Sequence, residues 1–132
     1  METPFVRVAD MMQTSLHFVS GVASVQDAIE EMKQHKVSSL VIEHRHPGDE
    51  YGLLTVYDIA AKVVAVNRST ERTSVYEVMT KPALTLSGNM NAKYAIRLLA
   101  RLELTRALVV GDDGPLGLVT LRDLVLSYSS AE

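Results

Sequence analysis

Two copies of one short pattern place a hydroxyl and a carboxylate three residues apart, at points where a helix is expected to begin. The copies are Thr55 with Asp58, and Thr120 with Asp123. A threonine at this position can cap the helix, and an acidic residue three positions later suits the first turn and its dipole. Such a carboxylate can also accept hydrogen bonds from both hydroxyls of a ribose, while free backbone N–H groups nearby attract an anion. A single copy indicates a cap before it indicates a ligand, and the two roles are compatible.

Other motifs in the sequence give weaker evidence for a functional site. His44 and His46 lie on one polar stretch, but no third ligand is evident, so we interpret the stretch as a solvated loop and expect no metal site. The run Asp112-Asp113-Gly114 is a turn signal before it is a cation site. Cysteine is absent, which excludes disulfides and thiolate catalysis. The sequence also contains no Walker loop, Gly-x-Ser-x-Gly or His-Glu-x-x-His motif. We therefore predict that the protein is not an enzyme and requires no cofactor.

The overall composition is that of a globular protein and disfavours several partners. Hydrophobic residues make up 47% and charged residues 22% of the chain. The formal net charge is −3 and lysines and arginines are not clustered, so we expect no binding to nucleic acid. No stretch approaches the roughly 20 apolar residues of a membrane span, and the first residues lack the pattern of a signal peptide. We predict a soluble, cytoplasmic protein that does not bind membranes.

The two motifs belong to a longer internal repeat, which we assign to residues 1–66 and 74–132 with a polar linker at 67–73. The alignment shifts by two residues in the loop between Glu43 and Tyr51, a change that loops accommodate at little cost. The aligned segments include Ser20-Gly21 with Ser87-Gly88, Ala28-Ile29 with Ala95-Ile96, and Gly52-Leu53-Leu54-Thr55 with Gly117-Leu118-Val119-Thr120.

Each repeat is expected to fold as a βαββα unit. Hydrophobic residues at helical spacing predict an amphipathic helix at about 24–36, capped by Ser24, and a matching helix capped by Asn91. In repeat 1 we also expect a helical turn at 8–12, strands at 16–19, 39–43 and 51–54, and a closing helix at 56–66. In repeat 2 the corresponding elements are a helical turn at 75–79, strands at 83–86, 106–110 and 116–119, and a closing helix at 121–128.

This pattern resembles the cystathionine-β-synthase (CBS) domain family over nearly the whole chain. The resemblance implies an α+β (mixed α/β) fold, a tandem pair of βαββα repeats related by pseudo-twofold symmetry. Four features support the resemblance. The first is the leading segment Val78-Met79-Thr80-Lys81-Pro82, and the second is the pair of middle strands, Val37-Ser38-Ser39-Leu40-Val41-Ile42 and Leu104-Thr105-Arg106-Ala107-Leu108-Val109-Val110. The third is the motif Gly-hydrophobic-hydrophobic-Thr-x-x-Asp at Gly52 to Asp58 and Gly117 to Asp123, and the fourth is the occurrence of the repeats as a pair.

The resemblance also implies two ligand clefts, because in related pairs the ribose aspartate of one repeat works with the first and middle strands of the other. It places a phosphate-binding residue at Arg106, whose guanidinium suits phosphate oxygens, whereas the counterpart Ser39 carries no charge. We therefore expect the cleft with Asp58 to bind more tightly than the cleft with Asp123. The first cleft takes Thr55, Val56, Tyr57, Asp58, Leu84, Thr105 and Arg106, and the second takes Thr120, Leu121, Arg122, Asp123, His17, Val37, Ser38 and Ser39.

The function implied by the resemblance is that of a non-catalytic regulatory module. It would bind AMP, ADP or ATP as a regulatory ligand in the clefts between the repeats and signal by a change of conformation. Two alternatives stay open: another adenosyl ligand, such as S-adenosylmethionine or an NAD-type dinucleotide, and a purely structural dimerisation module with empty clefts.

The closing helices are more apolar than one core-facing stripe requires, which predicts a further buried face. We expect that face to form a homodimer, in agreement with the disc-like dimers common among CBS pairs. The alternative is that the closing helices pack only within one chain. An effector protein acting in trans would read the conformation of the module.

Overall fold

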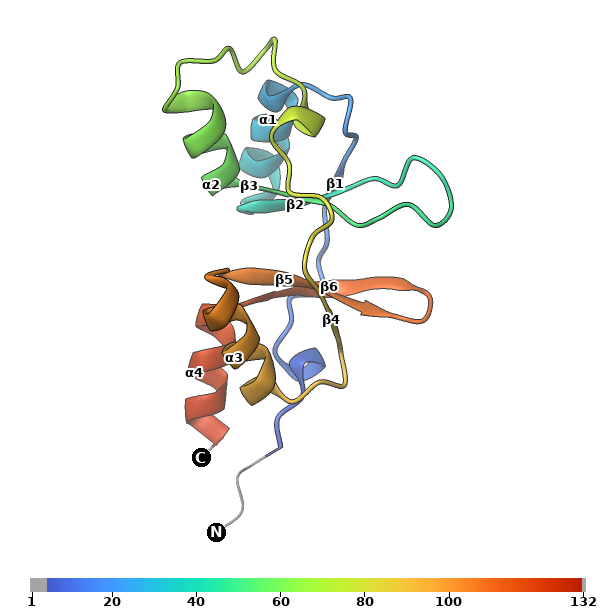
Figure 1. Cartoon of the computed structure of the whole chain (residues 1–132), viewed down its shortest axis with the longest axis vertical. Coiled ribbons are helices and arrows are strands. Elements are labelled where there is room, and N and C mark those ends of the chain that lie inside the picture. Colours follow the sequence, from blue (N-terminus) through green and yellow to red (C-terminus); the bar gives the residue numbers. More distant parts are fainter. Residues whose placement is uncertain (1–4, 132) are drawn as a thin grey trace. The chain divides into compact units, whose positions relative to one another are not determined.

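The computed structural model of the chain describes residues 5–131, and its helices and strands recur in the same order in the two repeats (Figure 1). The first repeat contains η1 (Val8–Asp10), β1 (Phe18–Val19), α1 (Val25–His35), β2 (Ser39–Ile42), β3 (Leu53–Thr55), α2 (Val56–Ile59) and η2 (Ala60–Val64). The second contains η3 (Val75–Glu77), β4 (Thr85–Ser87), α3 (Ala92–Leu102), β5 (Arg106–Gly111), β6 (Gly114–Thr120) and α4 (Leu121–Ala131).

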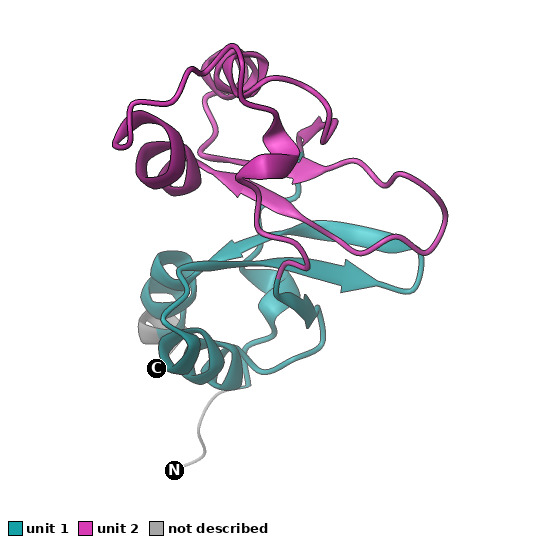
Figure 2. Ribbon diagram, turned by 45° about the horizontal axis from the view of Figure 1, so that its top comes forward, with its two compact units in different colours: residues 1–16, 84–132 teal, residues 17–83 magenta. Residues whose placement is uncertain are grey.

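The chain forms two compact units, which Figure 2 shows in different colours. Unit 1 comprises residues 1–16 and 84–132, and unit 2 comprises residues 17–83. Each unit holds one three-stranded sheet, ordered β1-β2-β3 in unit 2 and β4-β5-β6 in unit 1. The first two strands of each sheet are parallel and the last two antiparallel. Helices α1 and α2 cover one face of their sheet, and α3 and α4 cover one face of theirs (Figure 1). This arrangement confirms the predicted α+β fold of tandem βαββα repeats.

The boundaries of the compact units differ from those of the sequence repeats, because the leading segments are exchanged. In unit 1, the backbone N–H of Gln13 donates to Leu118 O at 2.7 Å, so the segment before β1 lies along the last strand of the other repeat. In unit 2, the N–H of Thr80 donates to Leu53 O at 2.9 Å in the same manner. The linker at 67–73 also packs within unit 2. The packing therefore divides the chain at 16/17 and 83/84, whereas the repeats meet at the linker.

The long helices begin and end where local chemistry predicts. The side chain of Ser24 accepts a hydrogen bond from Asp27 N at 3.0 Å, and that of Asn91 accepts one from Lys93 N at 2.9 Å. Lys36 and Glu103 end α1 and α3 in the left-handed conformation. The apolar positions face two separate cores. Buried members on α1 are Val25, Ala28 and Met32, and on α3 they are Ala92, Ala95 and Leu99, which confirms the predicted stripes.

The closing helices differ more from expectation. After the single turn of α2, the backbone widens into the π-helix η2, where the N–H of Ala65 donates to Ala60 O at 2.8 Å. Helix α4 is regular and extends past the predicted end at 128. Within the part of the chain that the structure describes, no helix is both long and apolar enough to cross a membrane.

Candidate functional site

The Thr-x-x-Asp motifs lie at equivalent places in the two units, where the last strand of a sheet passes into the closing helix. In unit 2, Thr55 Oγ1 accepts a hydrogen bond from Asp58 N and Asp58 Oδ2 accepts one from Thr55 N, both at 3.1 Å. In unit 1, Thr120 Oγ1 accepts from Asp123 N at 3.1 Å. The predicted helix caps are therefore present in both units.

The start of the middle strand lies beside the motif of the same repeat. In unit 2, Ser39 is paired with Thr55, and Val56 N donates to Ser38 O at 3.0 Å. In unit 1, Arg106 is paired with Thr120 in the antiparallel register of β5 and β6. The corresponding bond there runs from Leu121 N to Thr105 O at 2.7 Å.

The structure thus brings together the site residues that belong to one repeat. His17 and Leu84 immediately precede the first strands of their sheets, and their carbonyl groups accept hydrogen bonds from Val41 N at 2.9 Å and Leu108 N at 3.0 Å. The clefts expected from the family resemblance combine the motif of one repeat with strands of the other, and these pairings stay a prediction. Unit 2 carries Thr55, Val56, Tyr57, Asp58, His17, Val37, Ser38 and Ser39, and unit 1 carries Thr120, Leu121, Arg122, Asp123, Leu84, Thr105 and Arg106.

The Asp58 carboxylate is buried and both of its oxygens have partners. Oδ2 accepts the bond from Thr55 N, and Oδ1 lies 3.4 Å from Lys62 Nζ. The same ammonium donates to Val78 O at 3.0 Å. Only 10% of the Asp58 side chain is exposed. Lys62 was not among the predicted site residues, although its position one helical turn after Asp58 was visible in the sequence.

The Asp123 carboxylate is more open. Its side chain is 27% exposed, and Oδ1 lies 3.3 Å from Nη1 of Arg122, which is itself 79% exposed. Among the described residues, Asp123 accepts no hydrogen bond from Thr120 N, so the reciprocal half of the cap is missing in this unit. A ribose could reach this carboxylate without displacing a buried ion pair.

Each unit also contains a cavity near its closing helix, and the two cavities differ in lining. The cavity in unit 1 has a volume of about 540 Å³, within the range of small-molecule sites. Five predicted site residues line it, Thr105, Arg106, Thr120, Leu121 and Arg122, together with Val125 and Leu126. The cavity of about 380 Å³ in unit 2 is bounded mainly by apolar side chains, and of the predicted site residues it includes Val37 and Val56.

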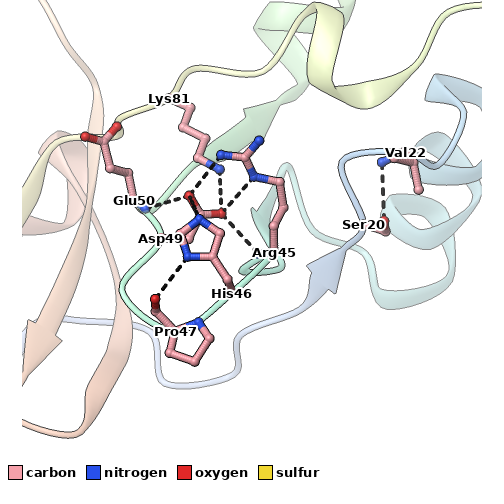
Figure 3. A network of polar contacts seen from close by, with 8 residues as sticks. All are labelled: Ser20, Val22, Arg45, His46, Pro47, Asp49, Glu50 and Lys81. Carbon is pink, nitrogen blue, oxygen red and sulfur yellow. Dashed lines mark hydrogen bonds and ion pairs between the residues drawn. The ribbon is translucent and has the colours of Figure 1, made fainter.

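A polar network in the loop between β2 and β3 was not foreseen from the sequence (Figure 3). His44, Arg45 and His46 are exposed, but the Asp49 side chain is only 4% exposed. Asp49 accepts hydrogen bonds from Arg45 Nε at 3.2 Å, Arg45 N at 3.0 Å and Lys81 Nζ at 2.8 Å. The Arg45 guanidinium, followed by the Lys81 ammonium, lowers the pKa of the Asp49 carboxyl far below its ordinary value. The network borders a cavity of about 600 Å³ at the hairpin end of the sheet, away from Asp58.

Two sheets of matched topology, each with a Thr-x-x-Asp motif where its last strand meets the closing helix, define a paired-repeat module. The profile of the CBS domain family matches residues 8–65 and 75–130. The chain belongs to the CBS domain family, as the resemblance implied.

Known relatives share this architecture over most of the chain. The CBS domain-containing protein YhcV of Bacillus subtilis is 33% identical over 125 residues, which cover 95% of this chain and 87% of YhcV. The hexameric CBS-CP12 protein from bloom-forming cyanobacteria has a TM-score of 0.89 at 31% identity, covering 92% of this chain and 67% of that one. The CBS domain pair of protein MJ0100, solved with 5′-methylthioadenosine and S-adenosyl-L-methionine, has a TM-score of 0.82 at 22% identity, covering 98% of this chain and all of that pair, and shows likeness of fold alone.

Proposed function

We propose that the protein is a non-catalytic regulatory module that binds an adenine nucleotide, AMP, ADP or ATP, through its Thr-x-x-Asp motifs. The observation that carries the proposal is the recurrence of the motif at the same point of two CBS repeats, each time beside the start of a middle strand. A carboxylate at this place can accept both hydroxyls of a ribose, and arginine guanidinium groups suit the phosphates. Arg106 and Arg122 line the cavity next to one motif.

An adenosyl ligand without phosphate is the second candidate, because the CBS pair of MJ0100 was solved with two such compounds. Both candidates need the ribose carboxylate, but only a nucleotide carries phosphates, and 5′-methylthioadenosine carries no anionic group that the arginines could bind. An Arg106→Ala variant should therefore weaken the binding of ATP and leave the binding of 5′-methylthioadenosine nearly unchanged. An NAD-type dinucleotide would follow the behaviour of ATP, since it also carries phosphates.

The output of the module, in this proposal, is a shift between conformations that a partner protein reads. Assembly into a homodimer is part of the proposal, and it is supported by exposed apolar side chains on both closing helices, including Val56, Val64, Val125 and Leu126. The relative from cyanobacteria is itself described as hexameric. Light scattering coupled to size exclusion should give twice the mass of the chain, and a monomer at micromolar concentration would reject the dimer.

Calorimetry decides between the ligand classes. The titrants are AMP, ADP, ATP and S-adenosylmethionine, each added to the wild-type protein and to the double variant Asp58→Ala/Asp123→Ala. We expect micromolar binding of at least one nucleotide to the wild type and none to the double variant. If no adenine compound binds below millimolar concentration, the ligand proposal fails and a structural role is favoured.

A further inference from the structure

We propose that Lys62 occupies the Asp58 carboxylate, so that the two motifs are not equivalent and Asp123 is the principal ribose-binding residue. This inference rests on the proposed function, since it concerns the same motifs. It reverses the order suggested by the sequence, in which the position of Arg106 favoured Asp58.

The first step in the argument is the set of contacts around Asp58. A ribose diol needs carboxylate oxygens that can accept two hydroxyl protons. At Asp58, one oxygen accepts the Thr55 N–H and the other faces the Lys62 ammonium at 3.4 Å. The ammonium is also held by Val78 O at 3.0 Å, so it bridges the closing helix and the leading segment of the second repeat. A ribose at Asp58 must compete with both partners and enter a nearly buried position.

The second step is the different setting of the counter-ion in the other repeat. Asp123 Oδ1 lies 3.3 Å from Arg122 Nη1, but that arginine is 79% exposed, so the ion pair is solvated and weak. The residue four positions after Asp123 is Ser127, which has no charge, where the residue four positions after Asp58 is Lys62. The residue before Asp123 is Arg122, where Tyr57 precedes Asp58. Unit 1 therefore combines a more exposed carboxylate with a nearby guanidinium.

The third step is the space beside each motif. The cavity of about 540 Å³ in unit 1 includes Thr120 itself together with Arg106 and Arg122. The cavity in unit 2 includes Val56, but neither Thr55 nor Asp58 nor any arginine lines it. Asp123 does not line the cavity of unit 1, but the threonine of its motif and two arginines do, and none of their counterparts in the other repeat lines the cavity of unit 2.

The test is a comparison of stoichiometry and affinity by calorimetry, with ATP and S-adenosylmethionine as probes. The wild type should bind one equivalent per chain. Asp123→Asn should weaken that binding at least about tenfold, the loss expected when hydrogen bonds to a charged group are removed. Asp58→Asn should leave it within about twofold, which lies below the usual contribution of one hydrogen bond. These two variants retain Lys62, so they decide the proposal even if substitutions of the lysine disturb folding.

A second set of variants tests the role of the lysine directly. Lys62→Met keeps the aliphatic stem and removes the charge, and it should bind a second equivalent. The combined variant Lys62→Met/Asp123→Asn should bind one equivalent, now at Asp58. Lys33→Met is the matched control, because Lys33 is an exposed lysine on α1 whose ion pair with Glu30 spans 3.7 Å. Circular dichroism verifies that each variant is folded, and Lys62→Gln replaces Lys62→Met if the latter is not.

The outcomes separate this inference from the proposed function. If no adenine compound binds any of the proteins, the proposed function fails and the inference fails with it. If the wild type binds two equivalents, if Asp58→Asn loses binding as Asp123→Asn does, or if folded Lys62→Met still binds a single equivalent, the inference alone is overturned.

Discussion

The Asp58 and Asp123 carboxylates begin equivalent closing helices, yet their surroundings differ. Asp58 is buried and held by Thr55 N and Lys62 Nζ, whereas Asp123 is partly exposed and pairs with the exposed Arg122. The motif and the strands that position it are shared by both repeats, so the difference arises from single residues outside the motif. A repeat can thus preserve its fold while the aspartate of one copy is buried in an ion pair and that of the other stays partly exposed.

The hairpin loops of the two sheets also differ between the units. In unit 1, β5 and β6 are joined by a tight turn that pairs Gly111 with Gly114. In unit 2, the loop between β2 and β3 is longer and is held by the buried Asp49 and its two cationic partners. The longer of the two loops is thus the one that contains a buried polar anchor.

The largest difference in stability between matched substitutions in the two units is expected at Gly52 and Gly117. These glycines begin the Gly-hydrophobic-hydrophobic-Thr-x-x-Asp motifs. A Cβ atom at Gly117 would lie 2.5 Å from the backbone oxygen of Gln13 and 2.9 Å from Met12 Sδ, whereas one at Gly52 would lie 3.0 Å from a side-chain carbon of Ile42. Gly117→Ala must displace the leading segment, so it should lower the free energy of unfolding by about 3 kcal/mol, and Gly52→Ala by about 1 kcal/mol. Urea denaturation measures both, and equal losses would show that the leading segment yields easily.

A smaller difference in the free energy of unfolding is expected between the variants that remove Asp58 and Asp123. Asp58→Ala eliminates a buried acceptor of Thr55 N and the partner of Lys62, and should lower the free energy of unfolding by about 2 kcal/mol. Asp123→Ala leaves the Thr120 cap in place and should lower it by about 0.5 kcal/mol. The aspartate that matters more for stability is therefore expected to matter less for binding.

Thermal unfolding of the two alanine variants checks this order. Thr55→Ala and Thr120→Ala serve as matched controls, because each removes one cap and each should lower the free energy of unfolding by about 1 kcal/mol. A larger loss for Asp123→Ala than for Asp58→Ala would contradict the assignment of a structural role to Asp58.

The features that could be predicted from the sequence are those set by local or periodic signals. The caps at Ser24 and Asn91 and the buried stripes of α1 and α3 depend on neighbouring residues, and the repeat supplied a second example of each element. The motifs at Thr55 and Thr120 were found for the same reason.

The features that were missed depend on contacts between distant residues. The pairing of Gln13 with Leu118 and the bond from Lys81 to Asp49 join positions far apart in the chain, and no local sequence pattern predicts them. The π-helix after α2 also had no sequence signal, since its hydrophobic residues fit an ordinary helix. Lys62 is the exception, because its spacing from Asp58 could have indicated an ion pair.

The two hairpins should also differ in how their stability responds to acid. We expect the substitutions that test this to have the smallest effect on stability at neutral pH. The pKa of Asp49 is lowered in the folded protein by Arg45 and Lys81, so its contribution to stability is complete above the unfolded pKa of about 3.9 and declines as the pH falls below that value. Asp49→Asn should therefore lower the melting temperature at pH 7 and reduce the further loss between about pH 4 and pH 2. Asp112→Asn, at an exposed position in the tight turn of the other hairpin, should change neither quantity. Differential scanning calorimetry across this range measures both variants, and an unchanged acid response in Asp49→Asn would mean that Asp49 does not anchor the loop in solution.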